Sequence, residues 1–269
     1  MSKTNLNNAS FLRRFFQYQK ERFPFLAHGL LIGSFTFSAI SYSRISRGET
    51  GFISIRDYLI GVFITFSFFL LVRIFDEFKD QKEDAQYRTY LPVPIGLISL
   101  KELKVVGWFV GIVQLLVIVL FQPTMIYLYG IVLSYLLLMR VEFFVPAWLK
   151  KKHLLYIISH MLIIPLIDFY ASGLDWFLEG KSLHIGLGWF FLVSYFNGFV
   201  LEFGRKIRTP KTEEEGIISY TKLYGTKGGV LVWIFLLTLT FLFSIGASLY
   251  AGYGILSVVI FSVFFSAKK

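Results

Sequence analysis

The sequence contains no cysteine among its 269 residues, and it is poor in charged residues and in histidine. The lack of cysteine excludes disulfides, thiolate catalysis and cysteine-ligated metals. The four histidines lie far apart and form no closely spaced pair, which argues against a zinc site. Charged residues make up 16% of the chain, whereas a soluble domain carries about 25%. A large water-soluble fold is therefore not expected.

Apolar residues make up 55% of the chain and come in long runs rather than at amphipathic spacing. Each run is about long enough to cross a ~30 Å hydrocarbon core as a helix. The sequence predicts an all-α fold: a polytopic transmembrane bundle of about eight helices. We expect a single membrane domain over 1–269, with a basic, interfacial N-terminal segment at 1–24 and the bundle at 25–266. The expected spans are 25–45, 57–76, 103–121, 123–139, 153–171, 185–203, 228–248 and 250–266.

The net charge of +10 is concentrated in alternate loops between the apolar runs. Lys and Arg gather in the N-terminal segment, in the loops after the second, fourth and sixth runs, and at the C-terminus, while the opposite loops hold only Arg44, Arg47, Arg56 and Lys181. This pattern follows the positive-inside rule and does not indicate a nucleic-acid-binding surface. It predicts a multi-pass protein of the plasma or inner membrane with both termini in the cytoplasm. The first apolar run is too long and too late for a cleavable signal peptide.

Three acidic residues follow the second apolar run at i, i+4 and i+8: Asp76, Asp80 and Asp84. On one continuous helix they lie about 6 Å apart along one side. Such carboxylates suit Mg²⁺, which binds through one or two carboxylates plus substrate phosphates. Lys79 and Arg88 among them are suited to neutralising phosphate oxygens. The alternative is a solvated polar cap in which neighbouring charges pair with one another.

The stretch from Asp76 to Leu103 resembles the first signature of the UbiA superfamily of intramembrane prenyltransferases, an NDxxDxxxD helix followed by an NRPxRPLPSGxIS-type loop. Aligned without gaps, Asp76 takes the place of the Asn, and Glu77, Asp80 and Asp84 fall on the three aspartates. Leu91 replaces the second arginine of the loop. The loop's first arginine, its prolines, its glycine and its serine are matched by Arg88, Pro92, Pro94, Gly96 and Ser99.

A second family signature is expected after the sixth apolar run, and here the match is mixed. The stretch GIISYTKLYG, residues 216–225, resembles the end of that signature. The acidic pair that precedes it in the family is replaced by Glu202 alone, followed by Arg205, Lys206 and Arg208. Either Glu202 and one of the glutamates at 213–215 replace the family's second metal site, or that site is lost. A third interpretation is that the basic residues bind the diphosphate of the substrate directly. Asn197 is a weaker candidate, because a lone Asn in a membrane helix usually bonds to a neighbouring helix. The same interpretation applies to Asp168.

The resemblance implies transfer of a prenyl group from a prenyl diphosphate to a lipophilic acceptor, commonly aromatic, with Mg²⁺ at the cytoplasmic mouth of a bundle in the lipid bilayer. The implied catalytic and metal-binding residues are Asp76, Asp80, Asp84 and Glu202. The implied substrate-binding residues are Lys79, Arg88, Asn197, Arg205, Lys206 and Arg208. The alternative is a divergent UbiA-like membrane protein that binds a lipid or transports a small solute without chemistry.

Overall fold

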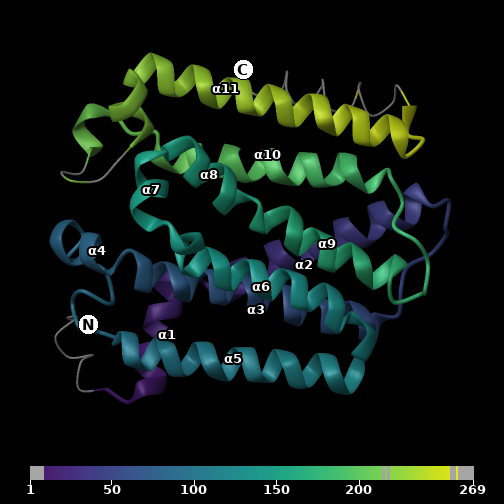
Figure 1. Ribbon diagram of the computed structural model, residues 1–269, viewed down its shortest axis with the longest axis horizontal. Coiled ribbons are helices and arrows are strands. Elements are labelled where there is room, and N and C mark those ends of the chain that lie inside the picture. Colours follow the sequence, from purple (N-terminus) through teal and green to yellow (C-terminus); the bar gives the residue numbers. More distant parts are fainter. Residues whose placement is uncertain (1–8, 214–215, 217–218, 255–258, 260–269) are drawn as a thin grey trace. The chain divides into compact units, whose positions relative to one another are not determined.

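The computed structural model describes residues 9–213, 216, 219–254 and 259. Within them every regular element is a helix, which confirms the predicted all-α fold (Figure 1). The chain divides into two compact units. Unit 1 contains residues 1–36, 55–146 and 214–217, and unit 2 contains residues 37–54, 147–213 and 218–269.

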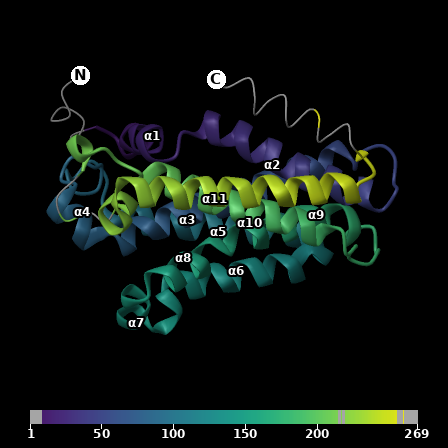
Figure 2. The same cartoon turned by 90° about the horizontal axis from the view of Figure 1, so that it is seen from above.

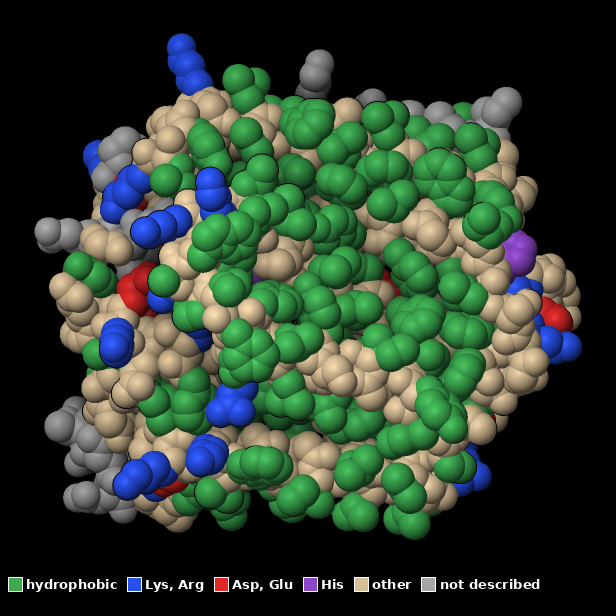
Figure 3. Space-filling model, viewed as in Figure 1, with side chains coloured by type: hydrophobic (Ala, Val, Ile, Leu, Met, Phe, Trp, Pro, Cys, Tyr) green, Lys and Arg blue, Asp and Glu red, His purple; other side chains and the backbone are tan. Residues whose placement is uncertain are grey.

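Seven helical segments in the described part of the chain are long and apolar enough to cross a membrane. Large hydrophobic side chains cover much of their outer surface, as lipid-facing helices require (Figure 3). The chain is thus a multi-pass helical membrane protein. The predicted eighth span at 250–266 lies largely outside the described residues. The seven segments are α2 (Phe25–Ser46), α3 (Ile55–Lys79), α5 (Leu100–Phe121), α6 (Ile126–Arg140) with the short turn before it, α8 (His153–Met161) with α9 (Ile163–Trp176), α10 (Leu187–Lys206) and α11 (Tyr220–Tyr250).

In unit 1, α3 packs against both α5 and α6. A tight turn joins α5 to α6, and it contains Gln122 and a short 3-10 helix at Pro123–Met125. The Gln122 side chain donates from Nε2 to Asp57 Oδ1 at 3.0 Å. Because Asp57 is in the first turn of α3, this bond joins the tight turn to the start of α3.

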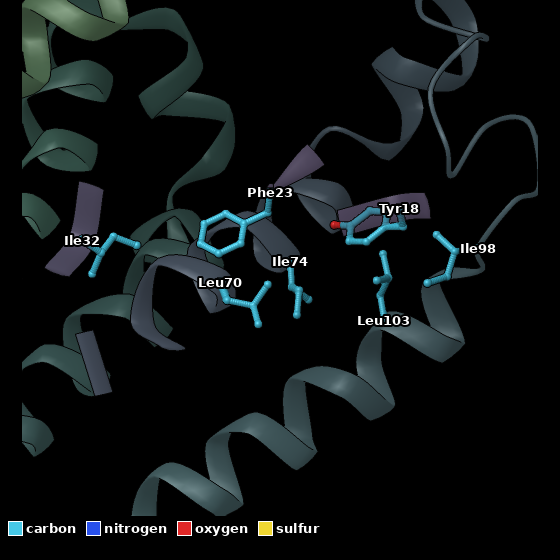
Figure 4. Packing of buried hydrophobic residues seen from close by; sticks show 7 residues of the cluster. All are labelled: Tyr18, Phe23, Ile32, Leu70, Ile74, Ile98 and Leu103. Carbon is cyan, nitrogen blue, oxygen red and sulfur yellow. The ribbon is translucent and has the colours of Figure 1, made fainter. Parts of the chain in front are cut away.

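The N-terminal segment forms a helix, α1 (Phe11–Arg22), that is joined to the rest of unit 1 by apolar contacts. Tyr18 is fully buried, and Figure 4 shows its ring between Ile74 of α3 and the side chains of Ile98 and Leu103. Arg14 donates to the carbonyl oxygen of Leu97 at 3.0 Å. The basic residues from Arg13 to Arg22 therefore belong to a docked helix rather than to a free tail.

In unit 2, α10 and α11 run side by side in both views (Figures 1 and 2). Trp233 of α11 donates from Nε1 to the carbonyl oxygen of Val200 on α10 at 2.9 Å. The helix predicted at 228–248 begins earlier, at Tyr220, and is interrupted at Gly225, where φ is +70°. Glycine adopts this left-handed conformation without the steric cost that a Cβ atom imposes.

The predicted span at 153–171 is not one helix but two, α8 and α9, with Leu162 between them. Pro165 explains the break, because proline has no N–H to donate to the carbonyl oxygen four residues earlier and its ring crowds that carbonyl. The backbone regains its helical bond at Leu166, whose N–H donates to Leu162 at 3.3 Å.

Candidate functional site

The candidate site in unit 1 lies where α3 ends and the short helix α4 (Gln81–Tyr87) begins. The expectation of one continuous helix carrying three aspartates is wrong: α3 ends at Lys79, and Asp80 adopts φ −87° and ψ 0° as the N-cap of α4. Backbone bonds still link Asp80 to Asp76 at 2.9 Å and Asp84 to Asp80 at 2.8 Å. The three aspartates therefore follow one another closely, but the helix axis changes direction at Asp80.

Glu77, which aligns with the first aspartate of the family signature, is buried and held by three donors. Its Oε1 accepts from Arg22 Nε at 2.7 Å, from Arg73 at 2.9 Å and from the Tyr18 hydroxyl at 3.3 Å. Arg22 and Tyr18 come from α1, so this carboxylate joins α1 to α3. Its bonding capacity is used within the protein, which suits a structural role.

Asp84 is also buried and is neutralised by arginine. Arg88 donates to Oδ1 at 3.2 Å, and an Arg22 nitrogen lies 4.0 Å from Oδ2. Burial nevertheless raises the pKa of Asp84, although the two arginines oppose this shift. Arg22 thus lies between Glu77 and Asp84 and organises both, although the motif pattern did not single it out.

Asp76 and Asp80 are the more accessible acids of the group. The Asp76 side chain is 32% exposed and lies 3.4 Å from Lys79 Nζ. Within the described residues Asp80 forms no ion pair within 4.0 Å. Burial, followed by the negative charges of Asp76, Asp84 and Glu83, raises the pKa of Asp80, while Lys79 opposes the shift. A carboxylate in this setting gains from any cation that approaches it.

The loop after α4 is shaped by the residues that the family resemblance singled out. Gly96 has φ +76° and closes a turn by donating to Val93 at 3.0 Å. Ser99 caps α5: its hydroxyl accepts from the Glu102 N–H at 3.2 Å, and Glu102 accepts from the Ser99 N–H at 2.8 Å. This reciprocal pair is a capping box. Arg14 of α1 also bonds to Glu102 and holds the box against α1.

In unit 2, Glu202 lies near the end of α10 and forms ion pairs with two of the basic residues that follow it. Arg205 donates from Nε to Glu202 Oε2 at 2.7 Å, and Lys206 Nζ lies 2.7 Å from Oε1. The Lys206 ammonium also lies 5.9 Å from the ring centroid of Tyr220. Two adjacent cations therefore neutralise Glu202. Asn197, the other predicted site residue of this helix, is exposed on α10.

The remaining residues of the second signature form a bonded turn. Arg208 donates from its N–H to the Thr221 hydroxyl at 3.3 Å and from its guanidinium to the Thr212 carbonyl at 3.1 Å. Glu213 accepts from the hydroxyls of Thr221 and Ser219, and these bonds lower the pKa of Glu213. Residues 214 and 215, the other two glutamates of the run, lie outside the described residues.

Within unit 1, Gly216 of the second signature lies against the end of α4. Gly216 has φ +72°, and a Cβ atom there would lie 2.2 Å from the ring of Tyr87, the last residue of α4. Only glycine fits this position without moving the ring. Gly216 and the end of α4 are therefore packed together.

A metal ion at this site would depend on the acidic side chains near the end of α3. Within the part of the chain that the structure describes, no three His, Asp or Glu side chains converge closely enough to hold a metal. Arginines neutralise Glu77 and Asp84, and Lys79 pairs with the partly exposed Asp76, so Asp80 is the acid of this group that forms no ion pair among the described residues. Two carboxylates fit a Mg²⁺ ion that takes its other ligands from water and substrate phosphates.

Sequence reasoning also missed a buried ionic cluster in unit 2. Asp175 of α9 is fully buried, and its carboxylate accepts from the Ser43 hydroxyl at 2.6 Å, Arg44 at 2.9 Å and Arg47 at 2.7 Å. Both arginines also bond to Glu179; burial opposes ionisation there, but these bonds lower the pKa of Glu179. The signal in the sequence was Arg44 and Arg47, which lie close together on the side where few Lys and Arg are expected.

Comparison of the chain with protein-family models, curated proteins and solved structures gives no significant match.

Proposed function

We propose that this chain is a membrane prenyltransferase that acts on a prenyl diphosphate at the place where α3 ends and α4 begins. The observation that carries the proposal is the Asp80 carboxylate, which forms no ion pair among the described residues although acidic neighbours flank it. Its surroundings match the first signature of the UbiA superfamily from Asp76 to Leu103. Lys79 pairs locally with Asp76, as in a solvated cap, but Asp80 is left out of such pairing.

The substrate diphosphate carries several negative charges and needs compensating cations. In unit 1, Lys79 and Arg88 lie on either side of Asp80 in sequence and supply two of them. The family resemblance also implies substrate binding by Arg205, Lys206 and Arg208 of unit 2, and this stays a prediction from the sequence. Charge-assisted hydrogen bonds from such groups are about twice as strong as neutral ones.

The roles of Asp76 and Asp80 follow from the chemistry of the leaving group. A Mg²⁺ ion between them and the diphosphate would supply positive charge where negative charge develops. The C–O bond between the allylic carbon and the diphosphate breaks, and its electron pair leaves with the diphosphate. A new bond forms between that carbon and a lipophilic, aromatic acceptor, which then loses a proton. Aromatic side chains of the apolar helices would stabilise the allylic cation, since cation–π attraction is strong when desolvated.

The decisive experiment compares Asp80→Asn with Glu83→Gln, a neutral substitution at an exposed acid of the same short helix. Purified protein in detergent is titrated with a prenyl diphosphate with and without Mg²⁺. We expect Asp80→Asn to abolish the Mg²⁺-dependent part of binding, because an amide is a poor ligand for Mg²⁺. Glu83→Gln should bind as the unmodified chain does. Retention of metal-dependent binding by Asp80→Asn would refute the proposal.

Glu202, the one acid left near the end of α10 in the second signature, is paired with Arg205 and Lys206 instead of being open to a second metal ion. This pairing favours one alternative, a protein that binds a lipid phosphate without transferring its chain. Incubation with a radiolabelled prenyl diphosphate and a set of aromatic acceptors separates the two. Prenylated product supports the transferase, whereas tight binding with no product under the same conditions supports the alternative.

A further inference from the structure

Unit 1 carries an apolar groove of about 270 Å³ between α3, α5 and α6. Its walls are aromatic and aliphatic side chains, among them Phe75, Trp108, Leu115, Tyr129 and Leu137. The side chains of Trp108 and Leu137 are 66% and 44% exposed, so the groove opens on the outer surface of these helices. In a protein that spans a membrane, such a surface faces lipid chains.

Two glycines of α5, one turn apart, keep the groove open. Gly107 and Gly111 both line it. A Cβ atom at Gly111 would meet nothing within 4 Å, and one at Gly107 would approach Ile74 only to 3.7 Å. A Cβ atom at position 111 would therefore enter open space, and a longer side chain would extend from there into the groove that Gly111 lines.

Two cations lie at one end of this groove: Lys104 in the first turns of α5 and Arg140 at the last position of α6. The Arg140 guanidinium carbon lies 5.1 Å from the ring centroid of Phe75 and 6.0 Å from that of Phe78, and these cation–π contacts hold it at the groove. Among the described residues no carboxylate forms an ion pair with either cation. Figure 3 shows blue side chains near the left ends of α5 and α6, beside the hydrophobic surface of these helices.

The length of the groove corresponds to one leaflet of a bilayer. From Lys104 to Leu115, α5 rises by about 16 Å, roughly half of a ~30 Å hydrocarbon core. We propose that the groove binds one acyl chain of an anionic phospholipid, whose phosphate contacts Lys104 and Arg140. This proposal does not depend on the transferase proposed above.

The observations favour a phospholipid over a prenyl diphosphate at this place. The lining contains no Asp or Glu that could share a metal ion with a diphosphate. Two cations are suited to the smaller charge of a phosphodiester headgroup. The groove also opens sideways along the exposed helix surface, where a lipid enters without leaving its leaflet.

Trp108 provides a local reporter for this site. The full chain is reconstituted in phosphatidylcholine vesicles with increasing fractions of brominated phosphatidylglycerol or brominated phosphatidylcholine, whose bromines quench tryptophan fluorescence on contact. The chain has five tryptophans, so the Trp108 signal is the difference between the full chain and Trp108→Phe. We expect the brominated anionic lipid to quench this signal at a much lower fraction, by about fivefold for each of the two cations. Equal quenching by both lipids would overturn the proposal.

Three variants test the parts of the site. Lys104→Gln with Arg140→Gln should remove the preference for the anionic lipid, and Gly111→Leu should reduce quenching by both lipids. Lys101→Gln is the matched control, because Lys101 is an exposed cation of the same helix that does not line the groove. If Lys101→Gln removes the preference as fully as the double variant, the effect is general surface charge and the proposal fails. The double variant changes only exposed side chains, so it decides the matter even if Gly111→Leu does not fold.

Discussion

Asp168 and Asp175, two aspartates of α9, are both fully buried but have different surroundings. Asp175 is bonded to Ser43 and to two arginines. Asp168 pairs with no cation among the described residues, and neither of its oxygens makes a hydrogen bond of good geometry there, although Ser194 interacts with it. The two residues lie on one helix at equal burial, so they isolate the effect of the cations.

We predict that Asp175→Asn destabilises the protein far more than Asp168→Asn. Removal of the charge at position 175 leaves Arg44 and Arg47 with less compensation in a buried place, a loss of about 3–5 kcal/mol for a broken buried pair. At position 168 the same change separates no ion pair. Thermal unfolding in one detergent compares the two variants directly. Equal losses would show that the arginines do not determine the stability of this end of α9.

The Asp80 carboxyl predicts a pH dependence for substrate binding. Its pKa is raised above the ordinary value of 3.8 by burial and by its acidic neighbours. The folded protein thus holds the Asp80 proton to a higher pH than the unfolded chain does. The stability that the protonated Asp80 contributes is therefore complete below the pKa of the unfolded state and is lost as the pH rises through the pKa of the folded state. Asp80→Asn should therefore be no less stable than the unmodified chain at neutral pH.

Mg²⁺-dependent binding of a prenyl diphosphate has the opposite pH dependence, because it needs the ionised form. We expect binding to decline on acidification at a pH above that of an ordinary carboxyl group, in a titration from about pH 7 to about pH 4. Binding that stays constant until the ordinary carboxyl range would exclude Asp80 as the ligand.

At the scale of elements, the contact between Gly216 and Tyr87 joins the end of α4 to a segment far along the chain. We predict that Gly216→Ala destabilises the protein more than Gly180→Ala. Both positions have a positive φ, with a cost of about 1–2 kcal/mol for a residue with a Cβ atom, but a Cβ at Gly180 meets nothing within 4 Å. Only at position 216 must a ring also move.

A second substitution tests the cause of that difference. Tyr87→Ser removes the ring, so Gly216→Ala in this background should cost no more than Gly180→Ala does. The free energies of unfolding of the single and double variants give this comparison. A Gly216→Ala loss that is the same with and without the ring would show that the backbone conformation alone is responsible.

At the scale of the whole molecule, the distribution of Lys and Arg predicts the orientation in the membrane. The side expected outside the cytoplasm holds Arg44 and Arg47, but both are bonded to Asp175 and Glu179. Even with these two arginines, the expected outer side holds far fewer Lys and Arg than the expected cytoplasmic side. A reporter fused after Lys269 should therefore be detected in the cytoplasm. A signal on the other side would show that the number of spans is odd.

The sequence alone was sufficient to predict the helical class and most of the spans. These features depend on the length of apolar runs and on residues adjacent in the chain, so the information is local. The break at Leu162 was also within reach, because Pro165 lies in the middle of the predicted span. The predicted span is confirmed, but it consists of two helices rather than one.

Only the tertiary structure decided which acids of the first signature remain available. Glu77, Asp80 and Asp84 look equivalent in the sequence, but Arg22 and Tyr18 of α1 approach Glu77 from more than 50 residues away. Arg22 also approaches Asp84, whereas Asp80 forms no ion pair among the described residues. The physical reason is that hydropathy adds up along a segment, whereas the charge state and bonding of a carboxyl depend on the groups that folding brings to it.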